Sequence, residues 1–171
     1  VKFFNQDNTI SWDLIKNKMG DKSEKTLLNW RLPKPFDTSV DAAFTYDNDN
    51  IILTKDKLWI MFNKKTSKPT TTPNLIGKGL LSVPINSAID SAIKNSDGTY
   101  YFFRNNNWFK VSKNLKKIIT QGELNKDDWE GLPKQFTKKI NAIVEDDSGL
   151  YLFSGDQWII YDYQNKAVLK G

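Results

Sequence analysis

The sequence predicts an all-β fold, a four-bladed β-propeller, and three observations support this prediction. Segments of one pattern recur about every 50 residues, and their shared Asp or Asn positions, Asp41, Asp90 and Asn141, lie 49 and then 51 residues apart. A tryptophan follows each of these positions after 17 or 18 residues. Clusters of Gly, Asn, Asp and Ser separate the short apolar runs, as in antiparallel hairpins. A repeat of this length, built from strands and tight turns, is typical of propeller blades.

The first repeat is incomplete at its start. Phe3-Phe4 aligns with Phe102-Phe103, 99 residues later, and with Leu152-Phe153, a further 50 residues on. We therefore predict one domain in which the first blade lacks its first strand. The missing strand precedes residue 1, or the tail 166–171 replaces it, and the sequence leaves both alternatives open. Within residues 1–171, the predicted blades are about 1–36, 37–85, 86–136 and 137–171.

The third repeat shows the expected elements most clearly. Its apolar opening segment, 89–93, carries small residues, which crowded strands at a propeller axis require. A turn at 95–98 separates it from an aromatic strand over 100–103, since Gly98 can adopt a positive φ. The segment 113–122 has apolar residues at helical spacing and is expected to be a short helix or an outer strand. The remaining expected elements are a turn at 105–107, a strand at 108–111 and a linker at 129–133.

Residues 64–79 depart from this pattern. The stretch is rich in Lys, Thr and Pro, and we expect it to be an exposed loop. Loops on a rigid scaffold often carry recognition, although a tolerated insertion without function is the alternative. The residues predicted to contact a partner are Lys64, Lys65, Lys68 and Lys78.

The composition excludes most catalytic and metal-binding chemistry. The chain of 171 residues contains no Cys and no His. Disulfides, thiolate or imidazole metal sites, and Ser-His or Cys-His relays are therefore excluded. Adjacent acids at 127–128 and 146–147 fall in expected turns, where backbone geometry favours them. The sequence therefore predicts that the protein is not an enzyme.

The formal net charge of +5 is unevenly distributed along the chain. Lysines gather over residues 55–80 and acids over 141–171. A basic segment can attract an anionic partner, or it can be an ordinary solvated surface. Specific nucleic-acid binding is not expected, because the aromatic residues recur at strand positions and are assigned to the core. No apolar stretch approaches the ~18 residues of a transmembrane helix.

Three segments resemble hemopexin-like repeats: Val-Asp-Ala-Ala-Phe at 40–44, the strand pair over 150–161, and Trp-Glu-Gly-Leu-Pro at 129–133. The resemblance covers essentially the whole chain and implies a four-bladed propeller that serves as a binding module. It also implies an axial tunnel in which backbone carbonyls bind Ca²⁺ or Na⁺. The alternative is that the Asp and Asn side chains cap the inner strands through nearby backbone N–H groups. Carried over by position, the metal-binding carbonyls are those of Asp41, Ala43, Asp90, Ala92, Asn141 and Ile143.

We interpret the protein as a non-enzymatic binding module for a protein or glycan partner. Abundant Lys, Asn and Ile without Cys favours a secreted bacterial protein, such as a virulence or insecticidal factor. Two alternatives stay open: a carrier of polyamine or haem through the tunnel, and a structural or assembly domain of a larger toxin. Haem is the less expected ligand, because the chain has no His and because Met19, Met61 and the tyrosines are assigned to packing.

Overall fold

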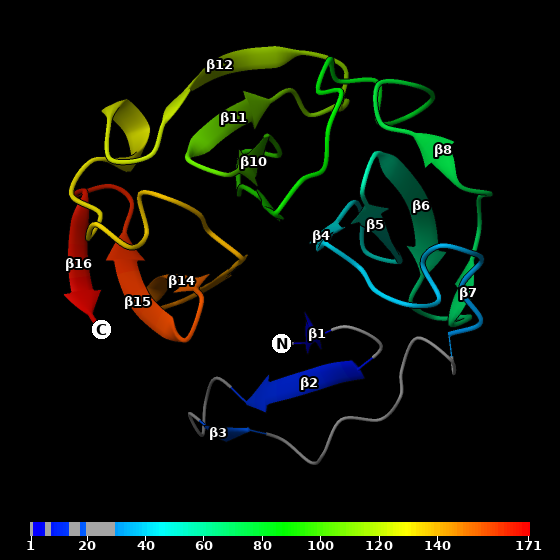
Figure 1. Cartoon of the computed structure of the whole chain (residues 1–171), viewed down its shortest axis with the longest axis horizontal. Coiled ribbons are helices and arrows are strands. Elements are labelled where there is room, and N and C mark those ends of the chain that lie inside the picture. Colours follow the sequence, from blue (N-terminus) through cyan, green and yellow to red (C-terminus); the bar gives the residue numbers. More distant parts are fainter. Residues whose placement is uncertain (1, 6–7, 14–17, 20–29) are drawn as a thin grey trace. The chain divides into compact units, whose positions relative to one another are not determined.

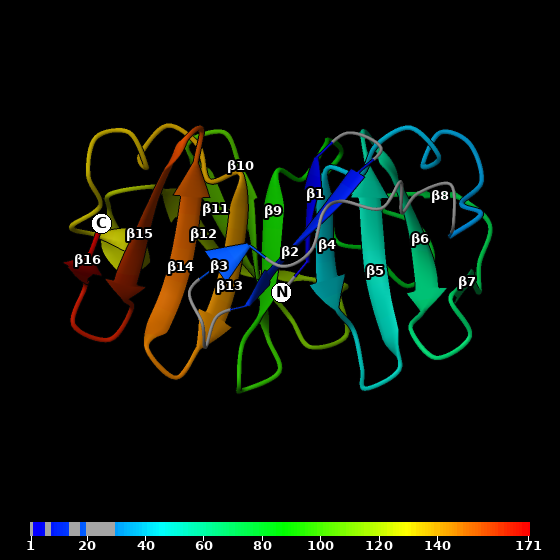
Figure 2. The same cartoon turned by 90° about the horizontal axis from the view of Figure 1, so that it is seen from below.

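The computed structural model describes residues 2–5, 8–13, 18–19 and 30–171, with side chains from residue 30 onward (Figures 1 and 2). Its strands form four antiparallel sheets, so the all-β prediction is confirmed. The chain divides into two compact units, Val1–Ala88 and Ile89–Gly171. The division falls at the junction of the second and third predicted blades, and a single domain of four blades stays a prediction. No helix in the described part of the chain is long and apolar enough to cross a membrane.

The first sheet has three strands in the order β1-β2-β3. Among the described residues, β1 pairs only with β2, from Lys2↔Ser11 to Asn5↔Asn8, so no opening strand lies on its other edge. The alternative in which the C-terminal tail supplies that strand is wrong, because the tail completes the fourth sheet. The strands concerned are β1 (Lys2–Asn5), β2 (Asn8–Asp13), β3 (Lys18–Met19), β15 (Gln157–Asp162) and, paired with β15, β16 (Ala167–Lys170).

The second sheet corrects the expectation of a free loop at residues 64–79. Two short strands within this stretch pair with the outer side of β6, one at each of its ends (Figure 1). The register joins Leu58 to Leu75 at one end and Phe62 to Pro69 at the other. The stretch is therefore an interrupted outer strand, because hydrogen bonds to β6 hold it. The strands are β4 (Ala42–Thr45), β5 (Asn50–Lys55), β6 (Leu58–Asn63), β7 (Lys68–Pro69) and β8 (Asn74–Leu75).

The third and fourth sheets share one topology, four antiparallel strands in chain order. The helical alternative for 113–122 is wrong. Leu115 is buried in a turn with φ +59, which no α-helix accommodates, and the residues after it pair with β11. The strands are β9 (Ser91–Lys94), β10 (Tyr100–Arg104), β11 (Asn107–Val111), β12 (Ile118–Glu123), β13 (Ala142–Asp146) and β14 (Gly149–Ser154), followed by β15 and β16.

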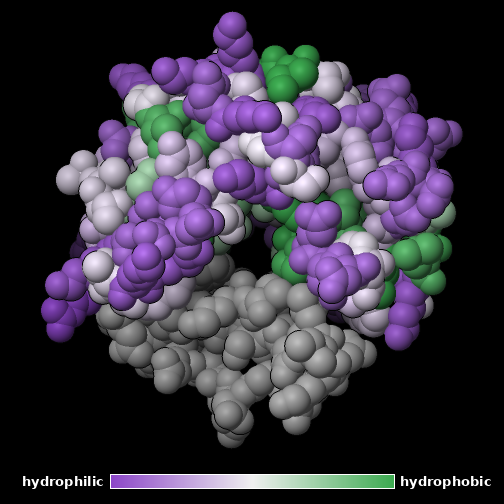
Figure 3. All heavy atoms as spheres, turned by 180° about the vertical axis from the view of Figure 1, so that it is seen from behind, coloured by the Kyte–Doolittle hydropathy of each residue, from purple (hydrophilic) through white to green (hydrophobic). Residues whose placement is uncertain are grey.

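Each unit has its own hydrophobic core. In the second unit one core joins both sheets, because aromatic residues of β10 pack against Trp129 of the 3-10 turn η1 (Asp127–Trp129), which stacks on Tyr161 of β15. In the face drawn in Figure 3, hydrophilic residues cover most of the described surface and hydrophobic residues form small groups. The first unit's core comprises Leu32, Phe36, Val40, Leu53, Ile60 and Phe62. The second comprises Tyr101, Phe103, Trp108, Leu124, Trp129, Leu132, Phe136, Ile140, Ile143, Leu152, Ile159 and Tyr161.

Candidate functional site

The repeated Asp and Asn residues bind backbone N–H groups. In each complete repeat the side chain accepts a hydrogen bond from the turn residue that follows the second strand. This turn residue has a positive φ, so the bond stabilises a left-handed conformation at the tip of the hairpin. These side chains therefore bond backbone N–H groups, as the alternative to metal binding predicted, but the groups belong to the turn after the second strand and not to the inner strand. The bonds run from Asp56 N to Asp41 Oδ2 (2.6 Å), from Asn105 N to Asp90 Oδ2 (2.6 Å) and from Gly155 N to Asn141 Oδ1 (2.9 Å).

The other three predicted metal-binding positions, Ala43, Ala92 and Ile143, lie on the opening strands β4, β9 and β13. In the second unit β9 and the start of the fourth repeat are joined by a hydrogen bond of 2.7 Å from Ser91 Oγ to Ile140 O. Within the described residues, no three acidic side chains are grouped so that they could hold a metal ion. Binding of Ca²⁺ or Na⁺ by the backbone carbonyls stays a prediction.

Removing the carboxylate of Asp90 should destabilise the second unit by about 1–3 kcal/mol. Besides its turn contact, Asp90 pairs with Lys139 Nζ at 2.8 Å, and its side chain is only 15% exposed. We expect Asp90→Ala to lower clearly the urea concentration at the midpoint of unfolding. Asp49→Ala is the matched control, because Asp49 is 41% exposed and its pair with Lys65 is a surface pair worth less than about 1 kcal/mol. Equal midpoints for the two variants would contradict this role for Asp90.

The second unit contains a groove of about 490 Å³. Its floor contains Tyr101 of β10 and Tyr163, which directly follows β15. Its rim is formed by the turn before β10, residues 95–97, and by residues 145–149 between β13 and β14. Sequence analysis did not find this groove, because its lining comes from two repeats whose packing the repeat pattern does not show.

Three polar side chains meet at the floor of the groove. The hydroxyl of Tyr101 donates to Asp128 Oδ2 at 2.5 Å and is also hydrogen-bonded to the hydroxyl of Tyr163. Asp128 lies in the 3-10 turn η1, so the prediction of a turn at 127–128 is confirmed, and its side chain is only partly exposed. Burial, reinforced by the hydrogen bond to Asp128, raises the pKa of Tyr101 well above its ordinary value. Burial also raises the pKa of Tyr163. Both phenols are therefore neutral at physiological pH.

Trp129 supports this floor from behind. Its ring lies edge-on to Tyr101 at 5.3 Å between centroids and stacks on Tyr161 at 5.8 Å. The hydroxyl of Tyr161 donates to Glu130 O at 2.5 Å, and burial raises the pKa of this phenol to about 12. The indole Nε1 of Trp129 is buried and has no hydrogen-bond partner within the described part of the chain. The floor is thus a rigid aromatic layer, because each ring is held by others.

Carboxylates surround the groove, and three of them have a turn-forming role. Asp97 accepts from Thr99 N at 2.8 Å, Asp146 from Ser148 N at 2.8 Å and Asp162 from Gln164 N at 2.9 Å. Hydrogen bonds from Thr99 lower the pKa of Asp97, and hydrogen bonds from Asn165 lower the pKa of Asp162. Asp97 and Asp162 therefore stay ionised at neutral pH.

Two further acids, Glu145 and Asp147, are exposed at the rim and have no ion-pair partner among the described residues. Lys110 is the only basic residue of the lining, and its Nζ lies 5.5 Å from the centre of the Tyr101 ring. The groove thus combines a strong excess of negative charge with aromatic walls. It can accept hydrogen bonds and attract cations, but it contains no nucleophile paired with a base.

The four predicted partner-binding residues lie elsewhere. All four are exposed and belong to the outer edge of the second sheet, in the first unit. They do not contribute to the groove. The residues are Lys64, Lys65, Lys68 and Lys78.

No family model matches the chain, and no curated protein matches its sequence. A hemopexin-fold protein from cow pea aligns over 99% of this chain and 85% of its own, with a TM-score of 0.77 and 16% identity. A plant lectin from Cicer arietinum with two metal binding sites aligns over 92% and 79%, with a TM-score of 0.73 and 14% identity. A seed albumin from Lathyrus sativus aligns over 92% and 78%, with a TM-score of 0.73 and 14% identity. These likenesses show that the chain has a hemopexin-like fold, and the number of blades stays a prediction.

Proposed function

We propose that the protein is a non-enzymatic binding module that holds a protein or glycan partner in the groove of its second unit. The observation that carries this proposal is the groove itself, in which a rigid tyrosine floor is surrounded by ionised carboxylates. Concave sites with aromatic walls and a few fixed polar groups are the usual form of ligand sites. The fold is compatible with such a role, since one neighbour is a plant lectin and another is a plant albumin showing hemagglutination.

The groove chemistry suits either kind of partner. Sugar hydroxyls would donate hydrogen bonds to the rim carboxylates and to the amide oxygens of Asn95 and Gln164, while a sugar ring would cover the exposed part of Tyr163. A protein partner would insert a lysine or arginine between the same carboxylates. Both modes require Glu145 and Asp147, because these two rim acids have no other partner among the described residues.

A small-ligand carrier is the second candidate, and the charge of the groove favours a polyamine over haem. Ammonium groups would be attracted by the carboxylates and by the tyrosine faces. Haem would need a phenolate ligand, because the chain has no His. The hydroxyls of Tyr101 and Tyr163 are bonded to each other, and burial disfavours their phenolate forms.

Binding should fall by about tenfold or more when both free rim acids are neutralised as Glu145→Gln with Asp147→Asn. The assay is a glycan array and a basic-peptide array, followed by calorimetry on the hits, with spermine measured in parallel. Glu123→Gln is the matched control, because Glu123 lies in the same unit outside the groove and pairs with Lys126. Binding that survives the double variant unchanged would refute the groove as the site. Binding of spermine alone would favour the carrier.

The remaining predictions concern bound ions and the location and source of the protein. Calcium or sodium bound at the carbonyls of the opening strands, an extracellular location, a bacterial source and a place in a larger toxin all stay predictions from the sequence.

A further inference from the structure

We propose that the outer edge of the second sheet, formed by β6, β7 and β8, is a separate binding surface for a linear anionic polysaccharide. This surface belongs to the first unit and does not depend on the groove. We call it the lysine edge and define it by its four unpaired lysines, Lys57, Lys64, Lys68 and Lys78. All four are exposed, and none forms an ion pair with any residue in the described part of the chain.

The lysine edge has a fixed backbone. Between β7 and β8, Thr71 Oγ1 accepts from Met61 N at 2.9 Å, and Thr70 N donates to Met61 O at 2.8 Å. The outer side of the middle of β6 is therefore bonded although neither β7 nor β8 pairs with it there. A surface with an ordered backbone loses less conformational entropy when it binds a ligand than a free loop would.

Two of the four lysines lie at each end of β6, and we call each such set of two neighbouring lysines a lysine pair. At its start, Ile76 N donates to Lys57 O at 2.8 Å, and Trp59 Nε1 donates to Lys78 O at 3.2 Å, so both lysine backbones are anchored. At its end, Lys68 pairs in register with Asn63, next to Lys64. Six residues of strand separate the two ends, which corresponds to about 20 Å.

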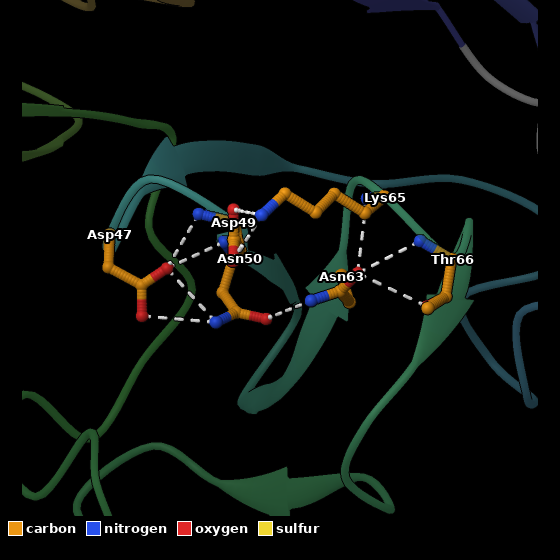
Figure 4. A network of polar contacts seen from close by, with 6 residues as sticks. All are labelled: Asp47, Asp49, Asn50, Asn63, Lys65 and Thr66. Atoms are coloured by element: carbon orange, nitrogen blue, oxygen red, sulfur yellow. Dashed lines mark hydrogen bonds and ion pairs between the residues drawn. The ribbon is translucent and has the colours of Figure 1, made fainter.

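A polar network around Asn63 orders the turn that follows β6 (Figure 4). Asn63 Oδ1 accepts from Lys65 N at 3.1 Å and from Thr66 N at 2.9 Å, which orders the turn after β6. Asp49 pairs with Lys65 at 2.8 Å, and its carbonyl accepts from Lys64 N at 2.7 Å. The nearby acid therefore neutralises Lys65 and leaves Lys64 without a counter-charge.

The separation of the two lysine pairs favours a long, linear ligand. A small anion would reach only one lysine pair, whereas a linear polymer with repeated sulfate or carboxylate groups would reach both. A single-stranded nucleic acid fits less well, because the aromatic side chains of this edge, Trp59 and Phe62, are 3% and 2% exposed and offer no face for base stacking. A linear anionic polysaccharide needs no aromatic platform and matches the spacing of the charges.

The test measures binding of the whole chain to dextran sulfate, with neutral dextran and duplex DNA as comparison ligands. Each of the double variants Lys57→Gln/Lys78→Gln and Lys64→Gln/Lys68→Gln should weaken dextran sulfate binding by about tenfold, and added salt should weaken it further. Two controls are matched to these variants: Lys116→Gln/Lys117→Gln, exposed in the second unit, removes the same two charges, and Lys65→Gln removes one charge that is already paired. Both should bind nearly as the unchanged protein does. Circular dichroism confirms that the variants are folded.

Three results would overturn the proposal. The first is an equal loss for the Lys116→Gln/Lys117→Gln control, which would mean that only net charge matters. The second is binding of duplex DNA as tight as that of dextran sulfate with the same lysine dependence. The third is equal affinity for sulfated oligosaccharides too short to span both lysine pairs. The groove variant Glu145→Gln/Asp147→Asn should keep full dextran sulfate binding, so failure of this proposal and failure of the groove proposal are distinguishable.

Discussion

Replacing Trp129 by alanine should lower the free energy of unfolding of the second unit by about 3–5 kcal/mol. Trp129 is fully buried, and its ring contacts Phe103 at 4.8 Å and Tyr101 at 5.3 Å between centroids. Its removal leaves a large cavity between the third and fourth sheets, because the surrounding side chains come from different strands and cannot collapse together. Chemical denaturation followed by circular dichroism measures the effect without relying on the lost indole.

The same variant should disturb the groove. Tyr101 and Tyr163 both rest on the Trp129 ring, so the hydroxyl contacts with Asp128 would lose their support. Trp158→Ala is the matched control, because Trp158 is only half-buried, stacks on Tyr151 and lies outside the core of the second unit. We expect Trp158→Ala to lower the free energy of unfolding clearly less than Trp129→Ala does. A cost for Trp129→Ala no greater than that for Trp158→Ala would show that the junction is not held by this residue.

Gly131→Ala should destabilise the second unit by about 2–4 kcal/mol, from backbone strain together with a collision. Gly131 has φ +81, a conformation that costs L-residues energy. A Cβ at this position would lie 2.4 Å from the carbonyl oxygen of Lys166, which is backbone and cannot rotate away. The substitution would therefore push apart the linker before the fourth repeat and the turn before β16. Thermal and urea unfolding both measure this loss.

Gly155→Ala separates the effect of backbone strain from the effect of the collision. Gly155 also has a positive φ, +61, but a Cβ there would meet only the amide Nε2 of Gln135, at 3.5 Å. This variant carries the strain without the collision, so we expect a cost of about 1 kcal/mol. Equal stabilities of Gly131→Ala and Gly155→Ala would contradict the close approach of Gly131 to the carbonyl oxygen of Lys166.

The local pattern of the chain was sufficient to predict its all-β class and most of its strands. Alternating apolar runs and turn residues act over a few neighbours, so the aromatic strand at 100–103 and the turn at 95–98 could be identified from adjacent residues alone. The polar contacts of Asp41, Asp90 and Asn141 could be anticipated only in kind, because each side chain bonds a backbone N–H that lies 14 or 15 residues later, in the turn after the second strand. At 113–122 the sequence was ambiguous, because the apolar spacing fitted two structures.

Tertiary structure alone decided the features that join distant segments. The stretch 64–79 became an outer edge because β6 offered hydrogen bonds to both of its ends, which its Lys- and Pro-rich composition does not indicate. Asp128 became bonded to the floor of the groove because packing around Trp129 brought it to Tyr101, 27 residues earlier, whose hydroxyl is also bonded to Tyr163. By itself the sequence determined strands, turns and repeats, because these depend on short-range preferences. The groove and the lysine edge depend on packing and pairing between strands, which no local pattern encodes.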